Sequence, residues 1–195
     1  MTAAMTKYGN LKLGQARTLF FLENGLPPDG GDSAKRWSVT FGKLSLSPTN
    51  FRWRRRALPC HDLHHIITEY ECSPAGEIQT AAWEFAAGRF PHPAATLFCL
   101  PLIAAGVVLW PKRTFRAFIR GRHSTTLYSE AISAELLDTR VNALQDRLLP
   151  AGAPKACVRD VLAYCRLVSF SLLLALSPVI AAVLVVWANA GSLPF

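Results

Sequence analysis

Residues 59–88 read PCHDLHHIITEYECSPAGEIQTAAWEFAAG, and glycine, proline and serine divide them into two helical runs. The first run contains neither glycine nor proline after its opening residue until it reaches Ser73-Pro74. Ser73 suits the N-cap of a second helix, Pro74 suits its first position, and Gly88 suits its end. We therefore predict two consecutive helices joined by a tight turn, over about 61–71 and 74–87.

The apolar pattern elsewhere in the chain is also helical. From Tyr128 to Leu148 apolar residues recur close to every 3.6 positions, which predicts a third long helix. Ala94–Trp110 is uncharged but contains Pro101 and Gly106, and we interpret it as a buried or interfacial helix pair rather than a membrane crossing. Since almost no segment alternates with period two, the predicted fold class is all-α.

The longest apolar run lies near the C-terminus, where Leu167–Ala190 holds 24 residues without a charged side chain. As a helix it measures roughly 36 Å, and the hydrocarbon core of a bilayer is about 30 Å thick. Pro178, preceded by Ser177, is expected to kink it, which is tolerated where a neighbour satisfies the freed carbonyl. A buried core helix is the alternative. We predict a mainly helical domain with a C-terminal transmembrane helix.

The distribution of charged residues predicts how the chain is oriented in the membrane and which partners it binds. Nothing after Arg166 is charged, so the positive-inside rule places the domain on the cytoplasmic side, or on the matrix side of the inner membrane in a mitochondrion. The formal net charge is +8, and no nucleic-acid recognition motif surrounds the densest basic run. We expect this run to face anionic lipid headgroups, and we expect no nucleic-acid partner. The run flanks Trp53 and consists of Arg52, Arg54, Arg55 and Arg56.

Proline and glycine clusters also suggest the division of the chain. Residues 1–35 are expected to form an irregular arm with a short helix around Gln15 to Glu23. The helical domain is expected over 36–150, a hinge over 151–166, and the membrane anchor over 167–190.

The chemistry is concentrated in the pentapeptide His61-Asp62-Leu63-His64-His65, which holds three of the five histidines. On a helix, His61 and His65 share a face and can direct their imidazoles at one point. Asp62 can bind a metal directly or orient a ligating histidine, and Glu77 lies one turn into the next helix. Two imidazoles with one or two carboxylates suit Zn²⁺ and would accept Fe²⁺ or Mn²⁺. The predicted divalent-metal ligands are His61, Asp62, His65 and Glu77, with His64 outside the ligand set.

Three other metal chemistries use similar histidine patterns. A zincin peptidase requires glutamate directly after the first histidine, where this chain has Asp62. Membrane di-iron enzymes require several histidine boxes, and only His92 and His123 remain outside this one. A phosphohydrolase of the HD type requires further distant ligands, which the sequence does not offer. A metal hydrolase of another kind would need a general base, for which Glu69 and Glu84 are candidates that we expect to be solvated.

The same residues resemble a known family. His61-Asp62-x-x-His65, eleven further residues and then Glu77 is similar to the HDxxH-x11-E pattern of the coenzyme Q biosynthesis protein 4 family. The similarity extends to Ala82-Trp83-Glu84 and, more loosely, to Gly121-Arg122 and Leu127-Tyr128. It covers roughly residues 35–150, and the C-terminal apolar helix is a departure from the family pattern.

The resemblance implies a mostly helical, membrane-associated protein that binds a polyprenylated aromatic lipid beside its metal. It implies a role in ubiquinone or related quinone biosynthesis, either as a metal-dependent lyase that removes the C1 carboxyl of a polyprenylated hydroxybenzoate or as an organiser of the other biosynthetic enzymes. A non-catalytic membrane scaffold with a structural metal is the alternative. Whether the chain forms a homo-oligomer stays open.

Overall fold

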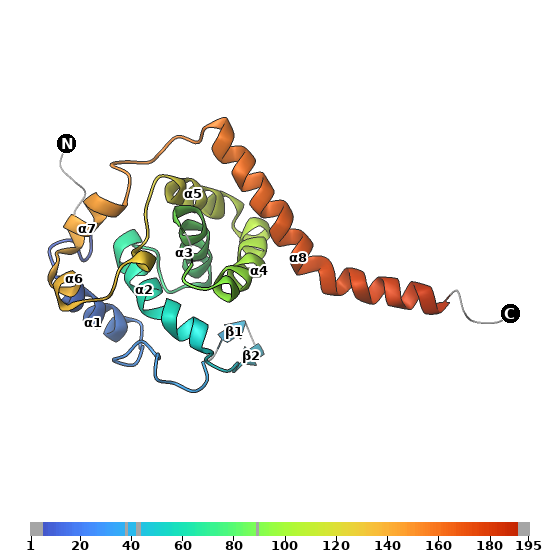
Figure 1. The fold of residues 1–195 in the computed structure, drawn as a ribbon, viewed down its shortest axis with the longest axis horizontal. Helices are drawn as coiled ribbons and strands as arrows, with labels where there is room; N and C mark the ends of the chain where they lie inside the picture. Colours follow the sequence, from blue (N-terminus) through green and yellow to red (C-terminus); the bar gives the residue numbers. More distant parts are fainter. Residues whose placement is uncertain (1–5, 38, 42–43, 89, 191–195) are drawn as a thin grey trace.

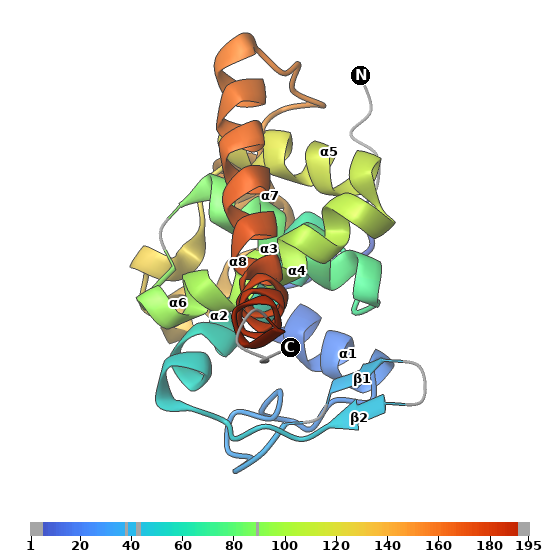
Figure 2. The same ribbon diagram turned by 90° about the vertical axis from the view of Figure 1, so that its right-hand side faces the viewer.

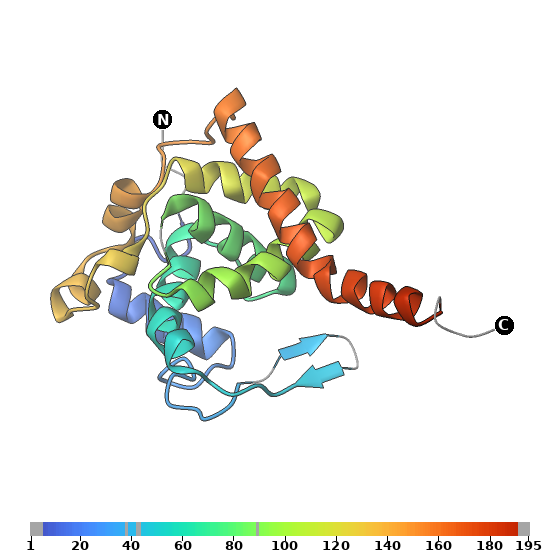
Figure 3. The same ribbon diagram turned by 45° about the vertical axis from the view of Figure 1, so that its right-hand side comes forward.

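The computed structural model describes residues 6–37, 39–41, 44–88 and 90–190, and about two thirds of this described part is helical. This confirms the predicted fold class. The helical domain is a bundle from which one long helix projects (Figures 1 and 3). The elements, in chain order, are α1 (Leu13–Glu23), β1 (Val39–Phe41), β2 (Leu44–Leu46), α2 (Arg52–Thr68), α3 (Pro74–Ala87), α4 (Pro93–Leu109), α5 (Pro111–Arg122), the 3₁₀ turn η1 (Leu127–Ser129), α6 (Ala134–Asp138), α7 (Val141–Leu148) and α8 (Val158–Ala190).

Helix α3 has the predicted bounds, whereas α2 begins nine residues before the predicted start and ends at Thr68, three residues before the predicted end. It begins at Arg52 and continues through Pro59, which has no N–H to donate to the carbonyl four residues earlier. It ends where Glu69 adopts a left-handed conformation, with φ at 63°. The Ser73 side chain then accepts a hydrogen bond from the N–H of Gly76, as expected of an N-cap. These two ends set the short connection that folds α3 back onto α2.

The apolar stretch after Gly88 forms one helix rather than the predicted pair. Pro101 lies inside α4 without ending it. Gly106 allows α4 to approach α3 closely, because a Cβ at this position would lie 2.2 Å from the Ile78 side chain. The buried face of α4 packs in the core, and its other face exposes Leu97, Phe98, Val108 and Leu109.

The prediction of one long helix from Tyr128 to Leu148 is wrong, since η1, α6 and α7 occupy this range. Thr139 is extended between α6 and α7. Its carbonyl accepts the N–H of Leu13, and the N–H of Val141 donates to the carbonyl of Leu11. Hydrogen bonds to a distant part of the chain thus replace helical ones at this break.

The segment expected as an irregular N-terminal arm contributes α1 to the core. Its side chains Leu13, Ala16, Phe20 and Phe21 are buried against α2 and the segment that carries α6 and α7. A second apolar cluster joins α3, α4, α5 and the first half of α8. Helix α2 lies between α1, α6 and α7 on one side and α3, α4 and α5 on the other (Figure 1). The β1–β2 hairpin lies at the edge of the domain (Figures 1 and 2).

Helix α8 is long and apolar enough to cross a membrane. The candidate span is Val158–Ala182, and an 18-residue stretch within it has a mean hydropathy of 1.9 with only 11% of that stretch buried. This low burial differs from that of a core helix of a soluble protein, and it is compatible with a single-pass membrane protein. Pro178 has no N–H to donate to the carbonyl of Leu174, four residues earlier. The Ser177 hydroxyl donates to this carbonyl instead, so the carbonyl that the proline frees is satisfied as expected.

Candidate metal centre

Two side chains from α2 and one from α3 meet at a single point. His61 and His65 are one helical turn apart on α2, and Glu77 lies in the first turn of α3. The Nε2 atoms of the two histidines are 3.1 Å apart. Glu77 Oε2 lies 3.2 Å from Nε2 of His61, and Glu77 Oε1 lies 3.5 Å from Nε2 of His65.

These separations suit a bound cation. Four ligand atoms placed tetrahedrally at about 2.0–2.1 Å from Zn²⁺ are roughly 3.3 Å from one another. One atom from each of His61, His65 and Glu77 lies within 4.8 Å of the others, so the cluster could hold a metal ion. His65 is buried, whereas the Glu77 side chain is 43% exposed, so solvent reaches the site from the α3 side.

Hydrogen bonds on the far side of each ring assign the tautomers. His65 Nδ1 lies 2.9 Å from the carbonyl oxygen of Tyr70, which can only accept, so Nδ1 carries the proton. His61 Nδ1 lies 3.1 Å from both carboxylate oxygens of Glu84 and donates to them. In the neutral rings that bind a metal, both Nε2 atoms are then left as electron-pair donors that face Glu77, and this is the usual arrangement around histidine metal ligands.

Glu84 is the centre of a buried network behind the ligands. It also accepts hydrogen bonds from His64 Nδ1 at 2.7 Å and from the Tyr128 hydroxyl at 2.8 Å. His64 Nε2 accepts the N–H of Leu127, which fixes the proton on Nδ1. The expectation that Glu84 is solvated is wrong, because its side chain is 1% exposed. Glu69, by contrast, is exposed and accepts the backbone N–H of Lys7.

The electrostatics of the cluster follow from burial and close opposite charges. Burial alone would lower the pKa of His61, but Glu84 and Glu77 outweigh it and raise this pKa well above its usual value. Burial would raise the pKa of Glu84 and of Glu77, but the neighbouring histidines hold both below their usual range. Burial lowers the pKa of His64, which favours the neutral ring that its hydrogen bonds require.

Asp62, the fourth predicted ligand, is not among the three converging residues. Its carboxyl is buried and lies beside Gly30, where a Cβ would be 2.6 Å from Oδ2. Burial raises the pKa of Asp62 to about 6, and His61 and His65 oppose this effect. Asp62 is thus near enough to interact electrostatically with the site without sharing its centre.

The sequence position of Glu84 relative to Glu77 already indicates that it belongs to the site. Glu84 follows Glu77 by seven residues, which places both on one face of α3 after two turns. The Tyr70 carbonyl and the Tyr128 hydroxyl have no comparable spacing along a helix, because their roles depend on the tertiary fold.

The donor set therefore consists of two oriented imidazoles and a carboxylate, with a buried second carboxylate behind them. Such a set fits a divalent transition metal by its chemistry. The similarity to HDxxH-x11-E depends on these individual residues. Comparison of the whole chain with protein families, with curated proteins and with solved structures gives no match.

Proposed function

We propose that this chain is a membrane-tethered divalent-metal protein that acts on a polyprenylated hydroxybenzoate in the biosynthesis of ubiquinone or a related quinone. The observation that supports it most strongly is the convergence of His61, His65 and Glu77, with both histidine Nδ1 protons already engaged. This arrangement gives the HDxxH-x11-E pattern a physical role, and the pattern supplies the proposed substrate class.

His61, His65 and Glu77 would hold the metal. Asp62 lies outside this group in the structure, and as the proposed fourth ligand its carboxylate would have to move toward the ion. Zn²⁺ is the proposed ion, with Fe²⁺ or Mn²⁺ as substitutes. When bound, the ion would supply Lewis acidity toward the ring substituents as the C1 carboxyl leaves. Glu84 would keep His61 oriented, and the exposed side of Glu77 leaves room for a ligand to approach.

Arg54 is the proposed partner of the substrate carboxylate. Arg54 is half-buried, so burial lowers its pKa, and the charges of Asp62 and Glu77 oppose this effect. Its guanidinium stacks 4.3 Å above the Trp37 ring and donates to Asn50, which holds it in place. A held guanidinium pairs well with a carboxylate.

The apolar surfaces suit the polyprenyl tail. Helix α4 leaves Leu97, Phe98, Val108 and Leu109 exposed, and α8 packs beside it before projecting from the domain. A tail lying along α4 would continue into the bilayer that α8 is proposed to cross. The basic residues on the domain place it on the cytoplasmic or matrix side in this proposal.

The test combines metal content with a quinone-lipid profile. His61→Ala and Glu77→Gln would be introduced into cells that depend on this chain, with Glu71→Gln, an exposed carboxylate in the α2–α3 connection, as the matched control. We expect both site variants to lose metal and to accumulate the unprocessed ring acid, while Glu71→Gln does neither.

The outcomes separate the alternatives. Loss of metal with accumulated ring acid and intact partner assembly supports catalysis. Loss of assembly without ring acid favours a scaffold that recruits other quinone-biosynthesis enzymes. Full metal content in both site variants would overturn the metal assignment, and an unchanged lipid profile in metal-free variants would overturn the quinone role.

A further inference from the structure

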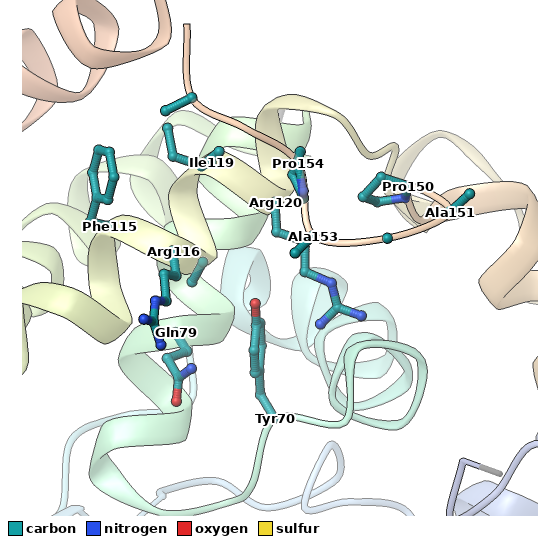
Figure 4. A pocket seen from close by; sticks show the side chains of 13 residues that line it. Tyr70, Gln79, Phe115, Arg116, Ile119, Arg120, Pro150, Ala151, Ala153 and Pro154 are labelled. Atoms are coloured by element: carbon teal, nitrogen blue, oxygen red, sulfur yellow. The ribbon is translucent and has the colours of Figure 1, made fainter. Parts of the chain in front are cut away.

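A cavity lies apart from the metal ligands, between α3, α5 and the loop that precedes α8. Its volume is about 600 Å³. Tyr70, Gln79, Arg116 and Arg120 contribute its polar side chains, and none of His61, His65 and Glu77 lines it. Figure 4 shows the Tyr70 hydroxyl pointing into the cavity between the two guanidinium groups, with the loop at Pro150–Pro154 above them.

The two arginines are free of carboxylate partners within the described part of the chain. Every ion pair found there involves other residues, and the Arg116 side chain makes no hydrogen bond there either. Arg116 and Arg120 are four residues apart on α5, so their side chains emerge on one face. Two unpaired guanidinium groups on one side of a cavity leave a concentrated positive charge that an anion would neutralise.

Two contacts hold the Arg120 side chain in place at the cavity. One of its terminal nitrogens donates to the carbonyl of Thr68 at 2.8 Å, and its guanidinium lies 5.5 Å from the centre of the Tyr70 ring. A guanidinium has five N–H donors, so most of them stay available to a ligand. Fixing the side chain beforehand lowers the entropy lost when a ligand binds.

The rest of the lining is apolar, which narrows the class of ligand. Phe115, Ile119, Pro150 and Pro154 surround the polar group. An inorganic anion alone would leave this surface unused, whereas a phosphate that carries an apolar portion would use both parts. Pockets for small molecules commonly combine an apolar lining with a few converging polar groups.

We infer that Arg116, Arg120 and the Tyr70 hydroxyl form an anion site for a phosphate-bearing ligand, distinct from the metal centre. The phosphate can belong to a lipid headgroup or to a soluble phosphate ester, since both present the same acceptor oxygens. The site does not depend on the proposed quinone function, so His61→Ala is expected to leave phosphate binding unchanged.

Titration calorimetry on the full chain in a non-ionic detergent, at constant ionic strength, tests the site. The probes are inorganic phosphate and dihexanoyl phosphatidate. We expect Arg116→Gln and Arg120→Gln each to raise the dissociation constant about tenfold, the loss of roughly one charge-assisted hydrogen bond. Arg113→Gln removes the same charge from α5 at an exposed position outside the cavity, and it should change binding less than about twofold.

Tighter binding of the phosphatidate supports a lipid headgroup as the source, and equal binding of both probes supports a soluble phosphate ester. Absence of binding by both probes would overturn the site, as would equal losses in Arg113→Gln and Arg116→Gln. Because Arg116 is exposed and its side chain makes no hydrogen bond within the described residues, its variant should fold, which circular dichroism would verify.

Discussion

The imidazole of His61 bridges two carboxylates, with Nδ1 3.1 Å from both oxygens of Glu84 and Nε2 3.2 Å from Glu77. Glu84 is buried and also accepts from His64 and Tyr128, so its position is fixed independently of any ligand. The buried carboxylate therefore determines which nitrogen of His61 can bind a metal. It does so without contributing a ligand atom itself.

Glu84→Gln should weaken metal binding about 10- to 100-fold, the range found when an outer partner of a ligating histidine is lost. The amide presents one acceptor and one donor to groups that all donate, so His61 loses its fixed tautomer. Competition titration with a chromogenic chelator measures the change, with Glu71→Gln as the control. Unchanged affinity in Glu84→Gln would show that His61 does not need this partner.

Asp62 predicts an effect of pH on stability. Its pKa is raised from 3.8 to about 6 because burial disfavours the charged form. The folded protein thus binds the proton more tightly than the unfolded chain, and stability falls as pH rises from about 4 through 6. A shift of this size corresponds to at most about 3 kcal/mol.

In the metal-free protein, Asp62→Asn should therefore raise the unfolding free energy at pH 8 and have little effect at pH 4. Chemical denaturation at both pH values measures this, with the exposed Asp146→Asn as the control. If Asp62 is a ligand, the same variant also weakens metal binding. A stability gain without any change in metal affinity would restrict the ligand set to the three converging residues.

The sequence was sufficient for those parts of the fold and site that depend on local spacing. The separation of His61 and His65 and the Ser73 cap are helix geometry, and the structure shows both. The break at Thr139 was not predictable in this way, because apolar periodicity continues across it. It depends on hydrogen bonds to residues more than 120 positions earlier in the chain.

The same limit applies to the site. Glu84 is buried with hydrogen bonds from Tyr128 and His64, which come from other elements of the fold. The spacing of residues along α3 does not predict these contacts. The placement of Asp62 depends on Gly30, in a loop 32 residues away in sequence. A spacing pattern identifies residues that can share a helix face, whereas tertiary packing decides which of them meet.

Gly30→Ala should destabilise the fold and disturb the surroundings of Asp62. Gly30 has a φ of 67°, and an added Cβ would lie 2.6 Å from Asp62 Oδ2 and 2.9 Å from the Phe21 ring. We expect a loss of about 2–4 kcal/mol, from backbone strain of about 1 kcal/mol plus overpacking of about 1–3 kcal/mol. Gly25→Ala is the matched control, because Gly25 has a φ of 63° and nothing within 4 Å. Thermal denaturation of both variants isolates the packing contribution, and equal losses would show that Asp62 and Phe21 yield to the added methyl group.

Leu173→Arg should weaken membrane insertion of α8. Leu173 is 63% exposed and lies in the apolar part of the candidate span. The wild-type sequence has no charged residue from Leu167 to Ala182. An arginine near the centre of a membrane helix costs about 2.5–3.5 kcal/mol on insertion scales. Leu22→Arg, at a position 77% exposed on α1, is the control for the substitution itself. Alkaline extraction of membranes should release a larger fraction of Leu173→Arg than of the wild-type chain or of Leu22→Arg. Equal retention of all three would mean that α8 does not hold the chain in the bilayer, and the apolar face of α8 would then have to pack against protein.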